Sequence, residues 1–194
     1  MISIKKNIKE FLRGLSYYYY KLKSFIYFYL YGINDLAGLI ERMPTFFLPK
    51  ILKDFGATIG NNVTIDSGIV IHRLSSFKDF SKIKIGNNTH LGHKMLLDVT
   101  NNIVIGDDCA FGANCQIWTH TGNWTKDRTD EADKVSPVLI GQAVICYSNV
   151  LIGQGVKIGD FARVGAGSVV LKNVENKAFY IGCPAKFKKK RDDI

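Results

Sequence analysis

His120 is the residue of this chain whose type and setting best suit acid–base chemistry. It stands in the run Gln116 to Asn123, next to Trp118 and close to Trp124. An imidazole titrates near neutral pH, so a neutral ring is available there to accept a proton. The residue type makes His120 a candidate for a general base, although a loop histidine without further context is more often a solvated side chain.

The remaining histidines and the cysteines do not predict a metal centre. Structural and catalytic zinc sites need three or four converging side chains at characteristic spacings. His90 and His93 are three residues apart and are predicted to lie at the surface. The four cysteines, none in a CxxC pair, are Cys109, Cys115, Cys146 and Cys183. We expect free thiols, with Cys146 a small core residue, and no required metal.

A repeat of six residues organises the middle of the chain. Apolar residues recur at every sixth position and are often followed by glycine. In five groups of three, they are Ile59, Ile65 and Ile71; Ile85, Leu91 and Leu97; Ile105, Phe111 and Ile117; Ile140, Cys146 and Ile152; and Ile158, Val164 and Val170. This period fits a short strand plus a turn, repeated around a three-sided coil. We therefore predict a mainly β prism of about five coils, with these side chains inside.

The repeat is interrupted three times, and each interruption follows a completed group of three. The spacing exceeds six from Ile71 to Ile85, from Leu97 to Ile105 and from Ile117 to Ile140. All three insertions must therefore leave from one edge of the prism. Loops on a rigid scaffold are where catalytic residues usually sit, so this edge is the predicted active site. His72, Asp98 and Trp118 directly follow the groups, and His120 comes two residues after Trp118.

The charge is concentrated at the two ends of the chain. The net charge is +9, of which residues 1–31 carry +5 and residues 186–194 carry +3. A protein that binds nucleic acid usually spreads its basic residues over a folded face, so the nearly neutral middle disfavours that class.

Four segments in the C-terminal part form a recognisable set. They are Ile140-Gly141, Gly155 to Asp160, Val164 to Val170 and Gly182 to Lys186. In these segments the chain resembles the hexapeptide-repeat acyltransferases, which include maltose, galactoside, serine and xenobiotic acetyltransferases. With the repeat, the resemblance covers residues 58–189. It implies a left-handed parallel β-helix, acetyl-CoA as acyl donor, and a homotrimer with active sites between neighbouring prisms. Cys146-Tyr147 and Leu171 depart from the family's usual residues.

The resemblance also implies roles for individual residues. His120 matches the general base, which takes the acceptor's proton in a ternary complex. Ser148 matches the residue whose backbone amide positions the thioester and holds the oxyanion in the adjacent coil. The residues expected to bind the acceptor or orient His120 are Asp98, His72 and Trp124; for Asp98 a local turn role is equally open. The residues expected to contact coenzyme A are Ala166 at the pantetheine arm and Lys172, Lys186 and Lys189 at the phosphates.

The first 57 residues are predicted to form a helical, aromatic and basic arm. Tyr17 to Tyr20 and Phe25 to Tyr31 supply the aromatic side chains, and Pro44 and Pro49 mark helix boundaries. The most apolar stretch is too short to span a bilayer. The arm either packs over the end of the prism or touches the membrane interface. We divide the chain into this arm, the β-helix of residues 58–175 and a basic C-terminal tail of residues 176–194.

The resemblance, taken together with the N-terminal arm and the long insertion at His120, implies an O-acetyltransferase that acts on a sugar hydroxyl of a bacterial surface polysaccharide or its precursor. We expect it in the cytoplasm, either free or at the inner face of the membrane. Serine or xenobiotic acetylation and a non-catalytic scaffold are the alternatives. The γ-type carbonic anhydrases share the prism, but their close histidine pair is five residues apart, so His90 and His93 do not match it.

Overall fold

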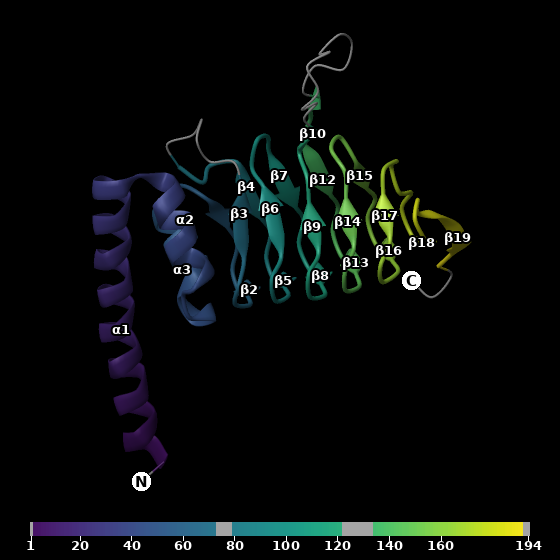
Figure 1. The fold of residues 1–194 in the computed structure, drawn as a ribbon. Helices are drawn as coiled ribbons and strands as arrows, with labels where there is room; N and C mark the ends of the chain where they lie inside the picture. The colour runs from purple at the N-terminus through teal and green to yellow at the C-terminus, as the bar shows by residue number, and fades with distance from the viewer. Residues whose placement is uncertain (1, 73–78, 122–133, 192–194) are drawn as a thin grey trace.

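The chain forms a prism of stacked short strands with a helical cap at one end (Figure 1). The computed structural model describes residues 2–72, 79–121 and 134–191; within the first helix, the side chains of residues 2–6 and 9 are outside that description. Three parallel sheets make the three sides of the prism, and successive strands along the chain pass from one sheet to the next. The predicted β-helix of five coils is confirmed.

Each sheet takes one strand from every coil. The first sheet contains β1 (Thr58–Ile59), β4 (Ile83–Ile85), β7 (Ile103–Ile105), β12 (Val138–Ile140) and β15 (Lys157–Ile158). The second contains β2 (Thr64–Ile65), β5 (His90–Leu91), β8 (Ala110–Phe111), β13 (Ile145–Cys146) and β16 (Arg163–Val164). The third contains β3 (Val70–His72), β6 (Leu96–Asp98), β9 (Gln116–Ile117), β14 (Leu151–Ile152) and β17 (Val169–Val170).

The repeat residues form the core of the prism. All fifteen are buried. Repeat residues at the same place in successive coils are paired in register, as Ile85 is with Ile105. A second set of buried residues lies two positions before them and includes Ile69, Met95 and Cys115. Because alternate residues of a strand face the same side, both sets point inward and fill the prism together.

Helices close the N-terminal end of the prism. They are α1 (Ile2–Tyr31), α2 (Ile33–Glu41), the 3-10 turn η1 (Thr45–Phe47) and α3 (Leu48–Asp54). Helix α2 lies against β3, and α3 and η1 lie against β1 and β2, so they cover the first coil. Helix α1 packs on the outer side of this layer (Figure 1). Among the described residues, no helix is both long enough and apolar enough to cross a bilayer.

Two strands extend the second sheet at the other end. β18 (Ala178–Ile181) pairs in parallel with β16, and β19 (Lys186–Lys190) folds back antiparallel on β18. The five residues of β19 are all exposed. The segment 176–194, which we expected as a basic tail, thus contains the ordered edge strand β19.

Candidate active site

The three interruptions of the repeat leave from one edge of the prism, between the third sheet and the first. They follow β3, β6 and β9, and the last begins with β10 (His120–Thr121), which pairs with β11 (Lys134–Val135). We call this the insertion edge. His72 and Asp98 are register partners in β3 and β6, and His120 lies beyond β9 in the next coil. Coil stacking therefore brings these three residues together, although 48 positions separate the first from the last in the sequence.

Asp98 is fully buried and is the centre of a hydrogen-bond network. Its Oδ2 lies 2.6 Å from Nδ1 of His120 and accepts the backbone amides of Thr119 at 2.8 Å and His120 at 3.0 Å. Its Oδ1 accepts the hydroxyl of Thr100 at 2.7 Å. Because the carboxylate has no solvent-exposed surface, its geometry is that of a group that orients His120 rather than one that meets an acceptor.

The network favours the ionised form of Asp98 and fixes the proton of His120. Burial acts to raise the pKa of Asp98, but hydrogen bonds from His120, Thr100 and Thr119 outweigh it and lower the pKa below its usual value. An ionised carboxylate can only accept hydrogen bonds, so Nδ1 of His120 carries the proton. Nε2 then holds the lone pair that a general base needs.

Two further aromatic rings surround His120. The exposed ring of His72 is stacked on it, with centroids 6.1 Å apart and 19° between the planes. Trp118 lies 6.1 Å from His120 and 5.7 Å from His72, measured between centroids. The imidazole is itself only 8% exposed. These contacts limit how far the His120 ring can turn, and the exposed His72 extends the cluster toward solvent.

His72, Asp98 and His120 are also the described residues that come closest to a metal-binding group. Each offers a ligand atom, and these atoms lie within 4.8 Å of one another. Both oxygens of Asp98 already accept hydrogen bonds from neighbouring residues. A metal ion that took Asp98 as a ligand would have to displace some of these donors, so the arrangement suits proton transfer better than ligation.

Ser148 and Ala166 lie on a different edge, between the second and third sheets. Ser148 follows β13, and Ala166 follows β16 in the next coil, where the Gly167 amide donates to the Ser148 carbonyl at 3.0 Å. Gly112 stands beside Ser148 in the previous coil; a Cβ there would lie 2.5 Å from the Ser148 nitrogen. Within the described residues, the Ser148 amide donates no hydrogen bond. We call this the Ser148 edge.

The two edges of one chain cannot form a single site. They are separated by the width of the third sheet, a strand and its turn, which spans roughly 15 to 20 Å. Ser148 belongs to the coil next to that of His120, but it lies on the Ser148 edge and not on the insertion edge. Within one chain, its amide therefore does not face His120. A reaction that needs both groups requires the Ser148 edge of a second chain.

The predicted lysines are exposed and lie near the C-terminal end of the prism. Lys172 follows β17 on the insertion edge, whereas Lys186 and Lys189 belong to β19, which extends the second sheet. The Ala185 amide, next to Lys186, donates to the Val169 carbonyl of β17 at 2.8 Å, so the start of β19 lies beside β17. Trp124 lies outside the described residues.

Sequence reasoning missed several polar residues of the insertion edge. Thr100 and Thr119 hold Asp98 in place, and Gln154, one coil further on, donates to the Thr121 hydroxyl at 3.1 Å. The Gln154 side-chain oxygen is buried and has no partner in the described structure. A signal was available, because all of them follow the third strand of a coil, as Asp98 and His120 do.

Comparisons with known proteins agree with this architecture. A model described as the hexapeptide repeat of succinyl-transferase matches residues 102–122 and 137–172. The chain is 29% identical to a putative acetyltransferase, YvoF, of Bacillus subtilis, over 79% of this chain and 83% of that protein. It is 27% identical to a galactoside O-acetyltransferase of Escherichia coli, over 71% of this chain and 65% of that protein.

A solved structure extends the likeness to three dimensions. A hexapeptide-repeat acetyltransferase of Vibrio cholerae, solved in complex with acetyl-CoA, superposes with a TM-score of 0.68 at 22% identity, covering 81% of this chain and 86% of that one. The fold is thus a left-handed parallel β-helix of the kind that acyltransferases use. The chain therefore carries hexapeptide repeats and is similar in sequence and fold to hexapeptide-repeat acetyltransferases.

Proposed function

We propose that this protein is an acetyl-CoA-dependent O-acetyltransferase that acts on a sugar hydroxyl. The observation that carries the proposal is the buried contact of 2.6 Å between Asp98 and Nδ1 of His120, which leaves Nε2 as a proton acceptor at a loop-lined edge. The named relatives that transfer acetyl groups to galactosides, and the neighbour solved with acetyl-CoA, support the choice of donor and acceptor.

In the proposed reaction, acetyl-CoA and the acceptor bind together. Nε2 of His120 takes the proton from the acceptor hydroxyl as its oxygen attacks the thioester carbonyl. The negative charge that develops on the carbonyl oxygen is held by a backbone amide, for which the free amide of Ser148 is our candidate. When the carbon–sulfur bond breaks, the imidazolium returns its proton to the departing thiolate. Asp98 stays ionised and stabilises the charged ring.

We further propose a homotrimer in which the insertion edge of one chain faces the Ser148 edge of its neighbour. This arrangement would bring His120 and Ser148 together, which one chain cannot do. Such heterologous contacts close into a ring under threefold symmetry. Ala166 would line the pantetheine groove of the neighbour, and Lys172, Lys186 and Lys189 would meet the phosphates. His72 and Trp124 would contact the acceptor.

The acceptor that we propose is a bacterial surface polysaccharide or its precursor, acetylated in the cytoplasm with a peripheral membrane contact through the N-terminal arm. The proposed arm is residues 1–57, followed by the catalytic β-helix, residues 58–175, and a C-terminal segment, residues 176–194. Support comes from the basic, aromatic composition of α1 and from the sugar acetyltransferases among the relatives.

Release of free thiol from acetyl-CoA tests the activity directly. The protein would be incubated with acetyl-CoA and separate acceptors: a galactoside, a maltose-type disaccharide, a capsular or O-antigen oligosaccharide, and serine. We expect thiol release that depends on a sugar acceptor, with a matching acetyl ester detected by mass spectrometry. Release with serine alone would contradict the choice of acceptor, and release with none of them would contradict the proposed function.

A further inference from the structure

Helix α1 carries an apolar face that nothing in the described structure covers. Eleven of its large apolar residues are between 46% and 76% exposed; apart from Tyr31, they are Ile8, Phe11, Leu12, Leu15, Tyr18, Tyr19, Leu22, Ile26, Tyr29 and Leu30. At 100° per residue the latter ten fall within an arc of about 120°, and no charged residue falls inside it. We call these ten residues the apolar stripe. Exposed patches of this size normally mark a binding surface.

The opposite side of α1 already fulfils the structural role of the helix. Phe25 and Phe28 pack against Phe55, with ring centroids 4.9 and 5.4 Å away. Lys21 forms an ion pair with Asp54 at 3.1 Å. None of these packing residues belongs to the apolar stripe, so the packing of α1 on the cap does not explain why the stripe is apolar. Helices α2 and α3 lie between α1 and the first coil (Figure 1), and the exposure of the stripe residues places the stripe away from this layer.

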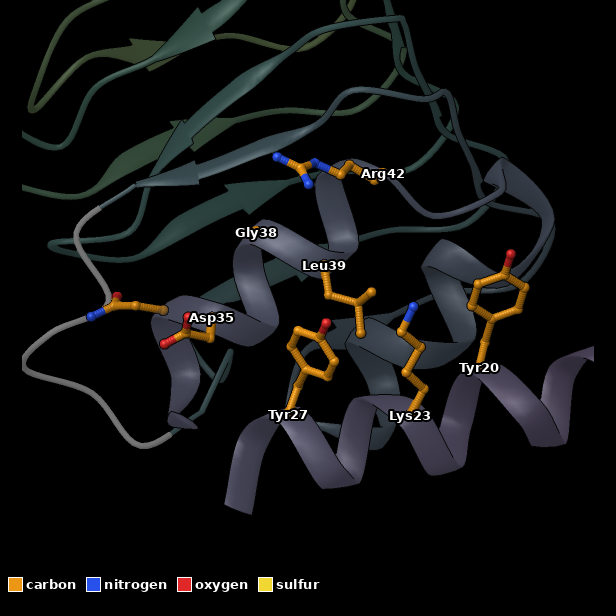
Figure 2. A pocket seen from close by; sticks show the side chains of 8 residues that line it. Tyr20, Lys23, Tyr27, Asp35, Gly38, Leu39 and Arg42 are labelled. Atoms are coloured by element: carbon orange, nitrogen blue, oxygen red, sulfur yellow. The ribbon is translucent and has the colours of Figure 1, made fainter. Parts of the chain in front are cut away.

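A polar cavity of about 420 Å³ borders one flank of the stripe, between α1 and α2. Figure 2 shows Tyr20, Lys23 and Tyr27 reaching from α1 toward α2, with Arg42 and Asp35 on the α2 side. The Lys23 ammonium lies 5.7 Å from the centre of the Tyr27 ring. Among the described ion pairs none involves Lys23, so its charge is free for a ligand. Hydroxyl, ammonium and guanidinium groups are suitable donors to a phosphate.

We propose that α1 docks the protein on an anionic phospholipid bilayer. The apolar stripe would lie at the boundary of headgroups and acyl chains, and Lys23, Tyr20 and Tyr27 would face lipid phosphates at the cavity. Tyrosines and lysines beside an apolar face are the usual composition of an interfacial helix. The inference deepens the peripheral membrane contact proposed above, and it is independent of the acetyl transfer chemistry.

Charge selects the bilayer over a second copy of this chain. Helix α1 contains six basic residues and one acidic residue, a net charge of +5. Two such helices packed along their stripes would repel each other, since the sequence supplies only Glu10 as a counter-charge. An anionic leaflet attracts the same charges, at about 1 kcal/mol or fivefold in affinity for each lysine near the surface.

Vesicle sedimentation of the full-length protein tests this inference. One set of vesicles contains phosphatidylcholine alone, and the other contains phosphatidylcholine mixed with phosphatidylglycerol. We expect binding to the mixed vesicles that weakens as salt is added. Replacing Leu15, Leu22 and Ile26 together with Gln should lower the partition coefficient at least about tenfold. Replacing Lys23 with Gln should lower it about fivefold.

Matched variants separate docking from folding. Leu171 is 60% exposed at the far end of the prism, close to the 62% of Leu22, so Leu171→Gln should leave vesicle binding unchanged. Lys84, exposed on β4, gives the corresponding control for charge, Lys84→Gln. Melting temperatures should be alike in all variants, because the replaced apolar side chains and Lys84 are exposed and the half-buried Lys23 forms no ion pair in the described structure.

Three outcomes would overturn the inference. One is failure of the wild-type protein to bind the mixed vesicles, and another is equal binding by the triple Gln variant. The third is self-association of the wild-type protein that the triple variant abolishes without any vesicle binding, which would identify the stripe as a contact between copies. Thiol release from acetyl-CoA without vesicles is measured on the same samples. A protein that binds vesicles but releases no thiol would contradict the proposed function alone.

Discussion

The insertion edge and the Ser148 edge are built from the same repeat but present different chemical groups. On the insertion edge, added residues bring side chains into contact, and the result is a buried carboxylate that holds an imidazole. On the Ser148 edge, the turns keep the six-residue spacing and what they expose is backbone, including an amide without a hydrogen-bond partner in the described structure. Side-chain chemistry thus accompanies the broken repeat, and backbone chemistry accompanies the intact one.

Removing the base should produce the largest loss. We predict that His120→Ala lowers kcat on the order of 10² to 10⁴-fold, the usual worth of a positioned general base. The fold should persist, because the ring lies at the root of a loop and outside the prism core. Steady-state kinetics of thiol release, with a melting curve as the control, measure this. A folded variant with near-normal kcat would show that the insertion edge does not supply the base.

Asp98→Asn should have the next largest effect. An amide placed where the carboxylate stands can donate toward Nδ1, and the proton would then move to Nε2, where a base needs a lone pair. We expect kcat to fall on the order of 10² to 10³-fold, with a much smaller change in the KM for acetyl-CoA. An equal rise in that KM would instead indicate that the change has spread to the donor groove.

From the lowered pKa of Asp98 we predict how the free energy of unfolding depends on pH. The pKa of Asp98 is lowered in the folded protein, so its contribution is complete above the pKa of an unfolded aspartate, about 3.9. That contribution is lost as the pH falls through the lower folded pKa. The free energy of unfolding of the wild-type protein should therefore exceed that of Asp98→Asn at neutral pH, and the two should converge below about pH 4. Urea denaturation across this range is the measurement, and a constant difference would contradict the assignment.

Much of the scaffold could be predicted from the sequence, because one large aliphatic residue must fill each side of each coil. The buried residues two positions before the repeat residues were not predicted. They include Ile69 and Met95 but also smaller residues such as Cys115, so the six-residue apolar pattern is weaker there. Thr100 was missed because, although it follows the third strand of its coil, its role depends on a hydrogen bond to the carboxylate of Asp98 that its residue type does not indicate. The strand β19 was missed because its exposed lysines do not alternate with apolar residues.

The Ser148 edge can be tested through a glycine beside it. Gly112→Ala places a methyl group 2.5 Å from the Ser148 nitrogen, so the backbone there must shift. We expect a loss of roughly 1–3 kcal/mol in stability and about a tenfold loss in kcat. Gly153→Ala is the matched control, since its nearest neighbour is the flexible end of Leu171 at 3.2 Å. Equal effects of the two changes would mean that the Ser148 edge has no special role.

Replacing the exposed lysines should have the smallest effect on activity, and that effect should be limited to the binding of acetyl-CoA. Replacing Lys172, Lys186 and Lys189 with Gln should raise the KM for acetyl-CoA about tenfold while kcat stays within a few fold. A short acetyl thioester without the nucleotide should show almost no change, because remote binding energy is then absent for both proteins. An equal loss of activity with acetyl-CoA and with the short thioester would indicate that these lysines act in the acetyl transfer step or in folding.

Mixing two inactive chains tests most directly the central claim, that each site combines the edges of two chains. His120→Ala removes the base from one edge, and Ser148→Pro removes the amide proton from the other. Asn149, the next residue, has a φ of 60°, as the third residue of a type II turn does, and proline is common at the second position of such turns; a melting curve of the variant checks that proline is accepted. Random trimers refolded from equal amounts of the two variants should recover about a quarter of the wild-type activity, since each site needs one intact edge from each neighbour. Activity no higher than that of the separate variants would contradict the claim.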